Sequence, residues 1–250
     1  LASVVDDIDH GITAILRGED HVTNSAAQIQ LFEALGATPP QMGHLALLAG
    51  ADGEGLSKRL GSLSVRQLRE EGIEAPALAS LLARIGTSVP VVPQASLADI
   101  IAGFDITSFG RATPKFSPDE LIQINARVLQ QLAFAAVAER LAEAGLEAVD
   151  ERFWLAVRGN ITTLQEAGDW WAVCHQPLTP EIEDEELLAA ALATLPDGPF
   201  GPDSWSDWTK AVSAATSKKG KALFMPLRKA LTGRAFGPDV GILLCYMSRE

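Results

Sequence analysis

The stretch GITAILRGEDH, residues 11–21, decides the fold of the N-terminal part of this chain. Its apolar run predicts a short buried strand that ends in charged residues. The next stretch, TNSAAQIQLFEALGA at 23–37, spaces its apolar residues as a helix does, and MGHLALLAG at 42–50 predicts another short strand. Strand, helix and strand in this order are typical of an α/β nucleotide-binding layer.

The flanks of this layer carry their own signals. Thr23 or Asn24 is the expected cap of the helix, and Gly36 is its expected stop. Upstream, SVV at 3–5 predicts a further short strand, followed by the acidic turn DDIDHG at 6–11. Because the chain opens without a methionine and inside an apolar run, we expect it to be part of a longer protein.

From residue 64 onward the sequence predicts helices. Successive segments place apolar residues at i, i+3 and i+4, with polar or proline starts and frequent glycine stops. These segments are SVRQLREEG at 64–72, APALASLLARIG at 75–86, SLADIIAGFD at 96–105, SPDELIQINARVLQQL at 117–132, FAAVAERLAEAG at 134–145, ERFWLAVRGNITTLQEAGDWWAV at 151–173 and PEIEDEELLAAALATL at 180–195. LPDGPFGPDSW at 195–205 predicts a loop between helical subdomains. We therefore expect a mainly α protein in which strand character fades after the opening layer.

The composition fits a globular protein with a sizeable core, because 47% of the 250 residues are apolar and 21% are charged. No window approaches the roughly 18 to 20 uninterrupted apolar residues of a spanning helix. We expect a soluble, cytoplasmic protein with no membrane partner. Cys174 and Cys245 form no CxxC pair, so we expect buried thiols and neither a disulfide framework nor a zinc site.

The charge is uneven, although its sum of −12 disfavours a polyanionic partner. No Lys or Arg occurs from Gly159 to Thr209, and no Asp or Glu from Trp208 to Pro238. The acid-free stretch contains Lys210, Lys218, Lys219, Lys221, Arg228, Lys229 and Arg234. It can form a basic face for a polyanion or an ordinary solvated helix face, and the sequence leaves both open.

The glycine-rich stretch ADGEGLSKRLGS at 51–62 also permits two interpretations. It can be a solvated turn. It can also be a phosphate-binding loop, because its backbone N–H groups, the Ser57 hydroxyl and the cations of Lys58 and Arg59 suit a triphosphate. Local composition does not decide between these interpretations.

The order and spacing of several motifs resemble glutamyl-tRNA synthetases, which are class I aminoacyl-tRNA synthetases. The motifs are VVDDIDHGITAILRGEDH at 4–21, HLALL at 44–48, LSKR at 56–59, LREEGIEAPALASLLARIG at 68–86, FSPDELIQINARVLQQL at 116–132 and PLRKALTG at 226–233. LSKR resembles the second signature of the class, and the resemblance covers essentially the whole chain. It favours the phosphate-loop interpretation of 51–62.

The resemblance implies a domain organisation. Residues 1–56 would be the second half of a Rossmann-type α/β catalytic domain, and 57–125 a stem-contact segment that begins with the LSKR loop. Residues 126–250 would be helical anticodon-binding bundles, with subdomains of about 126–180 and 181–250. The family joins L-glutamate to the 3′ end of tRNA(Glu) through glutamyl-adenylate, using ATP with Mg²⁺. Further implied features are tRNA(Gln) as an additional substrate, a monomeric state and no metal site within this chain.

The resemblance also assigns roles in catalysis and ATP binding. Lys58 would stabilise the transition state, with Ser57 and Arg59 beside it. Gly55 stands where the signature has its first lysine, which removes one cation, and Leu56 replaces its methionine. ATP binding would further involve Asp20 and, through backbone groups that hold adenine, Leu47 and Leu48.

Arg17 and Ser3 would bind glutamate, according to the same resemblance. An arginine at the end of an apolar strand needs a partner such as a carboxylate, and the alternative partner is Asp6 or Asp7 within this chain. His21 lies where some relatives have an aromatic residue, and its role stays open. His44 is expected to be a hydrogen-bonded strand-end residue rather than a catalyst.

The resemblance further implies tRNA contacts in the helical region. The expected residues are Arg158, Asn160, Lys218, Lys221 and Arg228, on helices that include one opening near Pro226. Some relatives place an arginine near Asn160 to read the third anticodon base, so asparagine leaves the choice between tRNA(Glu) and tRNA(Gln) open. Trp170 and Trp171 can stack on bases, but core packing is favoured.

The first signature of the class, His-x-Gly-His, does not occur in these 250 residues. Half of the ATP site is therefore expected outside the chain, which should not aminoacylate tRNA by itself. Two other interpretations remain. One is a non-catalytic tRNA-binding or scaffold module, which has no need of LSKR. The other is a glutamyl transferase that modifies a tRNA base, a type of protein that lacks anticodon-binding helices.

Overall fold

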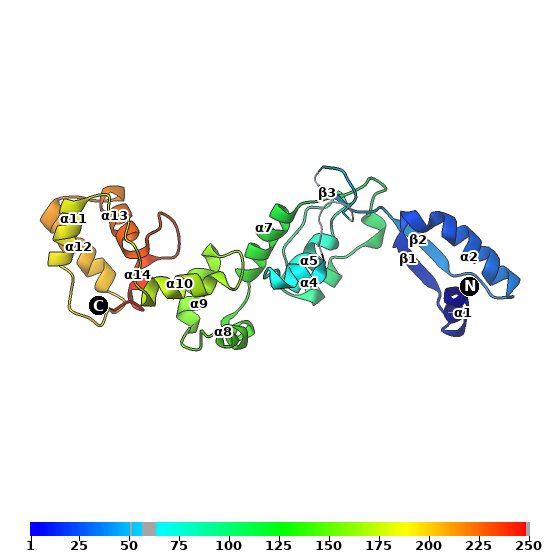
Figure 1. The fold of residues 1–250 in the computed structure, drawn as a ribbon, viewed down its shortest axis with the longest axis horizontal. Helices are drawn as coiled ribbons and strands as arrows, with labels where there is room; N and C mark the ends of the chain where they lie inside the picture. The colour runs from blue at the N-terminus through cyan, green and yellow to red at the C-terminus, as the bar shows by residue number, and fades with distance from the viewer. Residues whose placement is uncertain (51, 57–63, 249–250) are drawn as a thin grey trace. The chain divides into compact units, whose positions relative to one another are not determined.

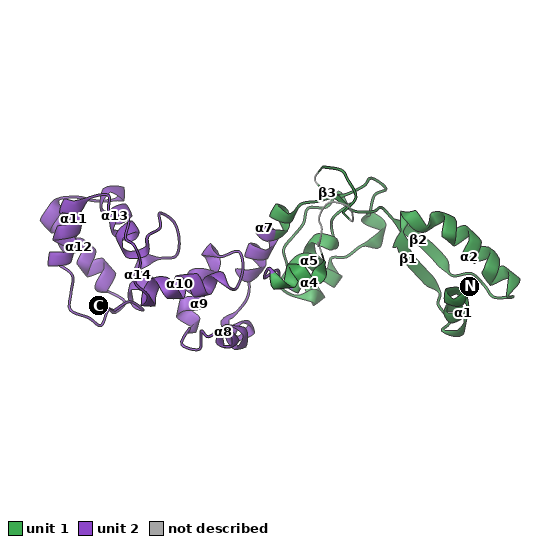
Figure 2. Ribbon diagram, viewed as in Figure 1, with its two compact units in different colours: residues 1–70, 75–121 green, residues 71–74, 122–250 purple. Residues whose placement is uncertain are grey.

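The structure is a computed structural model that describes residues 1–50, 52–56 and 64–248. The chain forms two compact units (Figure 2). Unit 1 comprises Leu1–Glu70 and Ala75–Leu121, and unit 2 comprises Glu71–Glu74 and Ile122–Glu250. Helices dominate and the described strands are short (Figure 1), so the expected mainly α fold is confirmed.

Unit 1 begins with the expected strand, helix and strand. Strands β1 (Ala14–Gly18) and β2 (Gln41–Leu45) pair in parallel. The expectation that the first strand is buried is wrong, because the residues of β1 are half-buried or exposed. The turn η1 (Glu19–His21) and helix α2 (Val22–Ala34) connect them. A parallel pair needs such a crossover, because the chain must return to the starting edge before the second strand begins. The carboxyl ends of both strands therefore lie at the same edge.

The prediction of a strand at 3–5 is wrong, because these residues lie in helix α1 (Ala2–Asp9). Val4 is fully buried while Ser3 and Val5 are exposed, and a three-residue apolar run is too short to distinguish this pattern from a strand. The acidic residues expected to form a turn continue the helix.

The expected bounds of α2 also need correction. Its cap residue is His21, without a side-chain bond to the backbone, and neither Thr23 nor Asn24 caps it. The amide of Asn24 instead contacts the His21 ring, at 3.1 Å. Gly36 does follow the end of the helix with a positive φ of 75°, as expected of a glycine stop.

The apolar run at 42–50 divides into β2 and a second strand, β3 (Ala49–Gly50). β3 pairs in parallel with β4 (Lys115–Phe116), which the sequence analysis did not predict. Two residues cannot show a strand alternation, so only the pairing of distant segments reveals such a strand. The rest of unit 1 is helical, with α4 (Val65–Glu70), α5 (Ala75–Leu82), α6 (Leu97–Ala102) and the turn η2 (Ile106–Ser108).

Unit 2 is built from short helices around two hydrophobic cores. The elements are α7 (Pro118–Leu129), which also carries the boundary between the units, η3 (Phe134–Ala136), α8 (Ala138–Glu143), α9 (Glu151–Val157), η4 (Arg158–Asn160), α10 (Glu166–His175), α11 (Glu185–Ala193), α12 (Ser204–Thr216), α13 (Lys221–Thr232) and α14 (Val240–Leu244). One core includes Phe153, Trp154 and Trp170, and the other includes Trp208 and Leu227. The predicted loop at 195–205 does separate α11 from α12.

Aspartates set the starts of several unit 2 helices. The Asp184 carboxylate accepts a hydrogen bond from the Leu187 N–H at 3.0 Å, which fixes the start of α11. The helix expected over 180–195 therefore begins only at Glu185. Helix α13 begins at Lys221 rather than near Pro226, which lies buried inside the helix. Gly220, with φ of 56°, directs the chain into α13 one turn earlier than the proline suggests.

The favoured interpretation of the tryptophans is confirmed. Trp170 is 4% exposed, and Trp171 makes an edge contact with Phe153 at 4.9 Å between ring centroids. Cys174 is buried and Cys245 half-buried, and both are free thiols. Among the residues described, no helix is long and apolar enough to cross a membrane.

Candidate functional site

The carboxyl ends of β1 and β2 bring together residues that the sequence analysis assigned to ATP binding. A Cβ atom added at Gly18 would lie 2.5 Å from the Asp20 Oδ1 atom and 2.8 Å from the Leu47 Cδ2 atom. A side chain at this position would displace the ends of the Asp20 and Leu47 side chains. The Leu47 N–H donates to the Glu19 carboxylate at 3.4 Å. The end of β1 and the segment after β2 therefore form one edge, where α/β layers bind ligands.

Leu48 leads from this edge into β3, where a tight turn anchors the glycine-rich stretch. Ala49 forms an antiparallel bridge with Gly55, and the Gly50 N–H donates to the Glu54 carbonyl at 2.8 Å. Gly53, with φ of 84°, closes the turn. Gly55 and Leu56 therefore follow directly from a turn that is hydrogen-bonded to β3. Ser57, Lys58 and Arg59 lie outside the described residues.

Arg17 lies near the end of β1. The alternative expectation for it, an ion pair with Asp6 or Asp7, is not found in the described structure. No described carboxylate, including those of Asp6 and Asp7, lies within ion-pair distance of it. Its Nη2 atom contacts the Met42 sulfur at 3.1 Å, and its buried Nε atom has no hydrogen-bond partner in the described part of the chain. A half-buried guanidinium without a carboxylate is suited to an anionic ligand.

Ser3 lies on α1 and is tied to α2 rather than to Arg17. The Gln28 amide donates to the Ser3 hydroxyl at 3.4 Å. The two residues assigned to glutamate binding therefore occupy different elements, with no hydrogen bond between them in the described structure.

His44 is a hydrogen-bonded strand-end residue, as expected. Its Nε2 atom lies 2.6 Å from the hydroxyl of buried Ser25, and that hydroxyl donates to the His21 carbonyl. Since the hydroxyl proton is used there, the His44 Nε2–H donates to the serine oxygen. His44 therefore links β2 to α2. The ring of His21 lies 3.8 Å from the Asp20 carboxylate at the exposed edge.

Of the expected tRNA contacts near the break after α9, one side chain has an internal role. The Arg158 Nη1 atom donates to the Leu132 carbonyl at 2.8 Å, and Trp154 Nε1 donates to the same oxygen at 3.0 Å. Arg158 thus helps to hold the segment after α7 against the first core. Asn160 is exposed, with one long bond to the Ala156 carbonyl at 3.5 Å.

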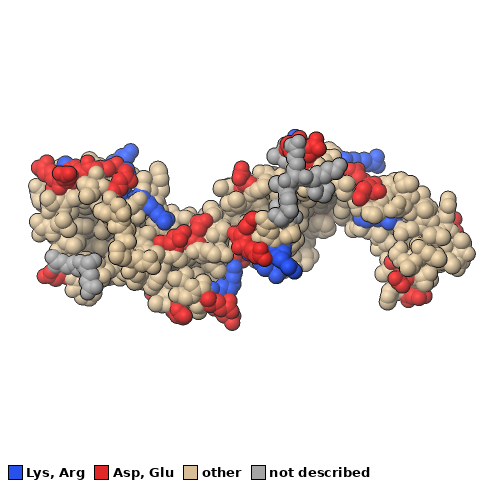
Figure 3. Space-filling view, in the orientation of Figure 1, with Lys and Arg blue, Asp and Glu red and all other residues tan. Residues whose placement is uncertain are grey.

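The basic stretch of the C-terminal region is partly neutralised by the acidic run before α11. Lys218 pairs with Asp184, and the Lys229 ammonium lies 2.6 Å from Glu181 and 2.5 Å from Glu183. Figure 3 shows acidic and basic side chains interspersed at the end of unit 2 that carries α11 and α13. Part of the positive charge of this stretch is therefore balanced within the unit.

These pairs shift the protonation equilibria of their members. The hydrogen bond from Lys218, followed by the Leu187 N–H, lowers the pKa of the Asp184 carboxyl. Hydrogen bonds to Glu181 and Glu183 raise the pKa of the Lys229 ammonium. Both shifts stabilise the charged forms at neutral pH.

Arg228 and Lys221 differ in whether their side chains are already hydrogen-bonded within unit 2. The Arg228 Nη2 atom donates to the Pro238 carbonyl at 2.9 Å, and its Nη1 atom is buried without a partner in the described structure. Lys221, at the start of α13, is exposed, and its side chain has no partner among the described residues. Of the basic residues expected to contact tRNA, Lys221 is the most available.

Sequence reasoning assigned no role to Gly18, which lies next to Asp20 and Leu47, and it did not predict the hydrogen bond from the Leu47 N–H to Glu19. A glycine at a strand end, directly before two acidic residues, was the available signal. No group of three or more His, Cys, Asp or Glu side chains suited to a metal ion occurs within 1–50, 52–56 and 64–248.

Comparisons with known proteins agree with this geometry. Residues 1–116 match the family model for the catalytic domain of class I tRNA synthetases (E and Q), and residues 157–250 match an anticodon binding domain. The chain belongs to the class I aminoacyl-tRNA synthetases. Within this class it groups with the glutamate–tRNA ligases, as its similar relatives show.

Glutamate–tRNA ligase 1 of Roseobacter denitrificans is 52% identical over 247 residues, covering 98% of this chain and 56% of the relative. The ligase of Azospirillum brasilense is 51% identical over 250 residues, again 56% of its length. A crystal structure of glutamate–tRNA synthetase from Elizabethkingia anophelis superposes with a TM-score of 0.73 at 25% identity, covering 99% of this chain and 56% of that one. The chain thus spans about half the length of the relatives it matches.

Proposed function

We propose that this chain supplies the second ATP signature and the tRNA-contacting part of a glutamate–tRNA ligase. In this activity, the glutamate carboxylate attacks the α-phosphate of ATP, pyrophosphate leaves, and the glutamyl group passes from the adenylate to the 3′-terminal ribose of tRNA(Glu). The observation that carries the proposal is the arginine near the end of β1. Arg17 is half-buried, has no carboxylate partner in the described part, and precedes the edge formed by Asp20 and Leu47. Family membership supports the same assignment.

In this proposal the nucleotide lies across the edge after β1 and β2. Asp20 would bind a ribose hydroxyl, and backbone groups of Leu47 and Leu48 would hold adenine. Gly55 and Leu56 would begin the loop on which Ser57, Lys58 and Arg59 contact the triphosphate. Fixed cations of this kind stabilise charge that develops on phosphate. Mg²⁺ would arrive with the triphosphate, since the described residues offer no dedicated cluster of ligands.

Arg17 and Ser3 would bind the glutamate substrate. A guanidinium pairs with a carboxylate through two parallel hydrogen bonds, and removing it from a half-buried site would leave the substrate charge without a partner. Ser3 would line the same pocket from α1.

For tRNA, Lys221 and Asn160 remain proposed contacts because both are exposed. Arg158, Lys218 and Arg228 stay weaker proposals, since each already bonds a group within unit 2. We propose tRNA(Glu) as the substrate, tRNA(Gln) as a second candidate, and a monomeric state in the cytoplasm. The domain bounds at 1–56, 57–125 and 126–250, with subdomains at about 126–180 and 181–250, also remain proposals.

We further propose that the 250-residue chain does not activate glutamate alone, because it lacks the His-x-Gly-His signature. Glutamate-dependent exchange between ATP and pyrophosphate by the purified chain would refute this. The positive test is a fusion that adds, ahead of Leu1, the portion of the Azospirillum brasilense relative that this chain does not match. Such a fusion is expected to aminoacylate transcribed tRNA(Glu).

Two variants of that fusion test the assigned roles. Lys58→Ala is expected to lower kcat about 10² to 10³-fold, and Arg17→Ala to raise the KM for glutamate about 10²-fold. Arg127→Ala, which removes an exposed charge from α7, is the control and is expected to behave as the unmodified fusion. An active fusion with unchanged kinetics in the first two variants would remove these residues from the site. A fusion that binds tRNA(Glu) without activating glutamate would favour the non-catalytic binding module.

A further inference from the structure

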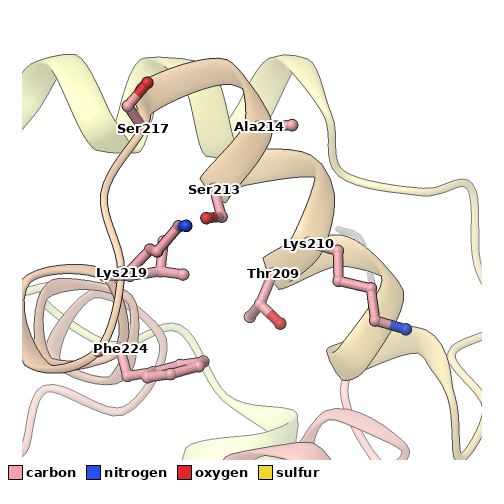
Figure 4. A pocket seen from close by; sticks show the side chains of 9 residues that line it. Thr209, Lys210, Ser213, Ala214, Ser217, Lys219 and Phe224 are labelled. Atoms are coloured by element: carbon pink, nitrogen blue, oxygen red, sulfur yellow. The ribbon is translucent and has the colours of Figure 1, made fainter.

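A hollow lies in the C-terminal subdomain of unit 2, between α12 and the start of α13. Its volume is about 650 Å³. The residues that define its chemistry are Thr209, Ser213, Ser217, Lys219 and Phe224. Figure 4 shows the Lys219 side chain reaching toward Ser213, with the Phe224 ring at the opposite side of the hollow. None of the proposed ATP, glutamate or tRNA residues lines this hollow.

Phe224 presents an aromatic face to the hollow. Its side chain is 45% exposed, although it belongs to helix α13 of a folded subdomain. Trp205 lies behind it, with 6.2 Å between the ring centroids, and packs against the buried Trp208. The ring therefore contacts Trp205 and remains nearly half exposed, as in sites where a base stacks on an aromatic side chain.

Lys219 supplies a positive charge that nothing in the described structure neutralises. Its side chain has no hydrogen bond or ion pair with the described residues, whereas Lys218 and Lys229 are paired with the acidic run. No acidic residue lines the hollow, and none occurs between Trp208 and Pro238. Lys210, on the rim, pairs with Asp207 at 3.1 Å, and its ammonium points away from the hollow (Figure 4).

Two hydroxyl groups of the wall use their protons in bonds to backbone carbonyls. Thr209 donates its proton to the Trp205 carbonyl, and Ser213 donates to the Lys218 carbonyl, both at 2.8 Å. Each oxygen can still accept a hydrogen bond. A stacking face, a free cation and acceptors for N–H groups together match the parts of an unpaired nucleotide.

We propose that this hollow binds one unpaired nucleotide of RNA, with its base stacked on Phe224 and its phosphate on Lys219. The proposal rests on the proposed function, in that the RNA is the tRNA of the ligase. Double-stranded RNA does not fit, because its bases are already stacked and cannot reach an aromatic ring at the protein surface.

The test uses the 250-residue chain and fluorescence anisotropy with three probes: transcribed tRNA(Glu), a short single-stranded RNA and the duplex of that RNA. Phe224→Ala is expected to weaken binding of tRNA and of the single strand about tenfold. Phe224→Tyr keeps an aromatic face and is expected to bind like the wild type. Leu192→Ala, a change at an apolar residue that is 71% exposed on α11, is the matched control.

Lys219→Gln is expected to weaken binding of all single-stranded sequences and to reduce the slope of log Kd against log salt by about 1. Arg127→Gln, an equal change of net charge on α7, is its control and should leave the slope unchanged. Circular dichroism establishes that each variant remains folded.

Wild-type affinity in both Phe224→Ala and Lys219→Gln would overturn the hollow as a nucleotide site while leaving the ligase proposal intact. An equal loss of duplex and single-strand binding in Phe224→Ala would also overturn it, because stacking would then not be the cause. If the unmodified chain binds no tRNA(Glu), the proposed function itself fails.

Discussion

The Lys229 ammonium group lies 2.6 Å from the Glu181 carboxylate, and the Glu181 N–H donates to the Lys229 carbonyl. The segment before α11 is thereby held to α13 through both side chain and backbone. Lys229 is only 14% exposed at its side chain, and Glu183 binds the same ammonium. The acidic run thus holds helix α13 in place through these contacts.

Replacing Lys229 by Met keeps the apolar stem of the side chain and removes the charge. We expect a modest fall in the Tm of unit 2, because two carboxylates lose their common partner. The loss should shrink at high salt, where exposed charges are screened. Thermal unfolding at low and high salt measures it. Lys210→Met, at a fully exposed pair, is the control, and an equal Tm change in both variants would contradict a special role of Lys229.

Asp184 is expected to make the stability of the C-terminal subdomain sensitive to acid. Its pKa in the folded chain is lower than its ordinary 3.8, so its contribution is present above that value and is lost as the pH falls through the folded value. Asp184→Asn keeps an oxygen for the cap and removes the charge. The variant should have a lower Tm than the wild type at about pH 7, and the difference should shrink as the pH falls below 3.8. A difference that persists in acid would contradict this assignment.

Asn125 is expected to be essential for the stability of unit 2. It is fully buried on α7, accepts from the Glu74 N–H at 2.7 Å, and donates to the carbonyls of Gly72 and Thr162. Asn125→Ala leaves one buried and two partly buried backbone groups without their partner, which should cost about 3 kcal/mol of unfolding free energy. Urea unfolding measures the loss. Asn160→Ala, at an exposed position, should change stability by less than about 0.5 kcal/mol.

Gly237 is expected to tolerate no side chain. Its φ is 146°, and an added Cβ would lie 2.2 Å from the Trp170 ring. The ring is buried and also lies under the Arg234 guanidinium at 4.4 Å, so it has little room to move. Gly237→Ala should therefore cost about 2 to 4 kcal/mol. Gly201→Ala, where an added Cβ meets open space, is the control. Similar denaturation midpoints for the two variants would contradict this packing.

The two cysteines should differ in reactivity toward a thiol reagent such as Ellman's. Burial raises the pKa of the Cys174 thiol to about 12, so the reactive thiolate is scarce near neutral pH. Cys245 is only half-buried and is expected to react first, by at least about tenfold. Cys245→Ser should remove the fast phase, and both thiols should react alike in denaturant. A fast phase that survives in Cys245→Ser would place the reactive thiol at position 174.

Local sequence patterns were sufficient to predict those helices and strands whose apolar spacing lies within one continuous segment. Most helices after residue 64 were predictable, because the apolar period reports which face will be buried. The strand expected at 11–18 is found at Ala14–Gly18, although none of its residues is buried. Short elements were not predictable. SVV at 3–5 resembles a strand but forms the start of α1, and β4 at Lys115–Phe116 exists only through its pairing with β3.

The site divides in the same way. The sequence by itself determined the family, because the order and spacing of LRGED, HLALL and LSKR are properties of the chain alone. Only the tertiary structure decided which charges are available. It pairs Lys218 with Asp184 and ties Arg158 to the Leu132 carbonyl. Among the described residues it leaves Arg17 without a carboxylate and Lys219 without a side-chain partner. The physical reason is that hydrogen bonds and ion pairs depend on distances of a few ångströms between residues far apart in sequence, and only the packing of helices and strands sets those distances.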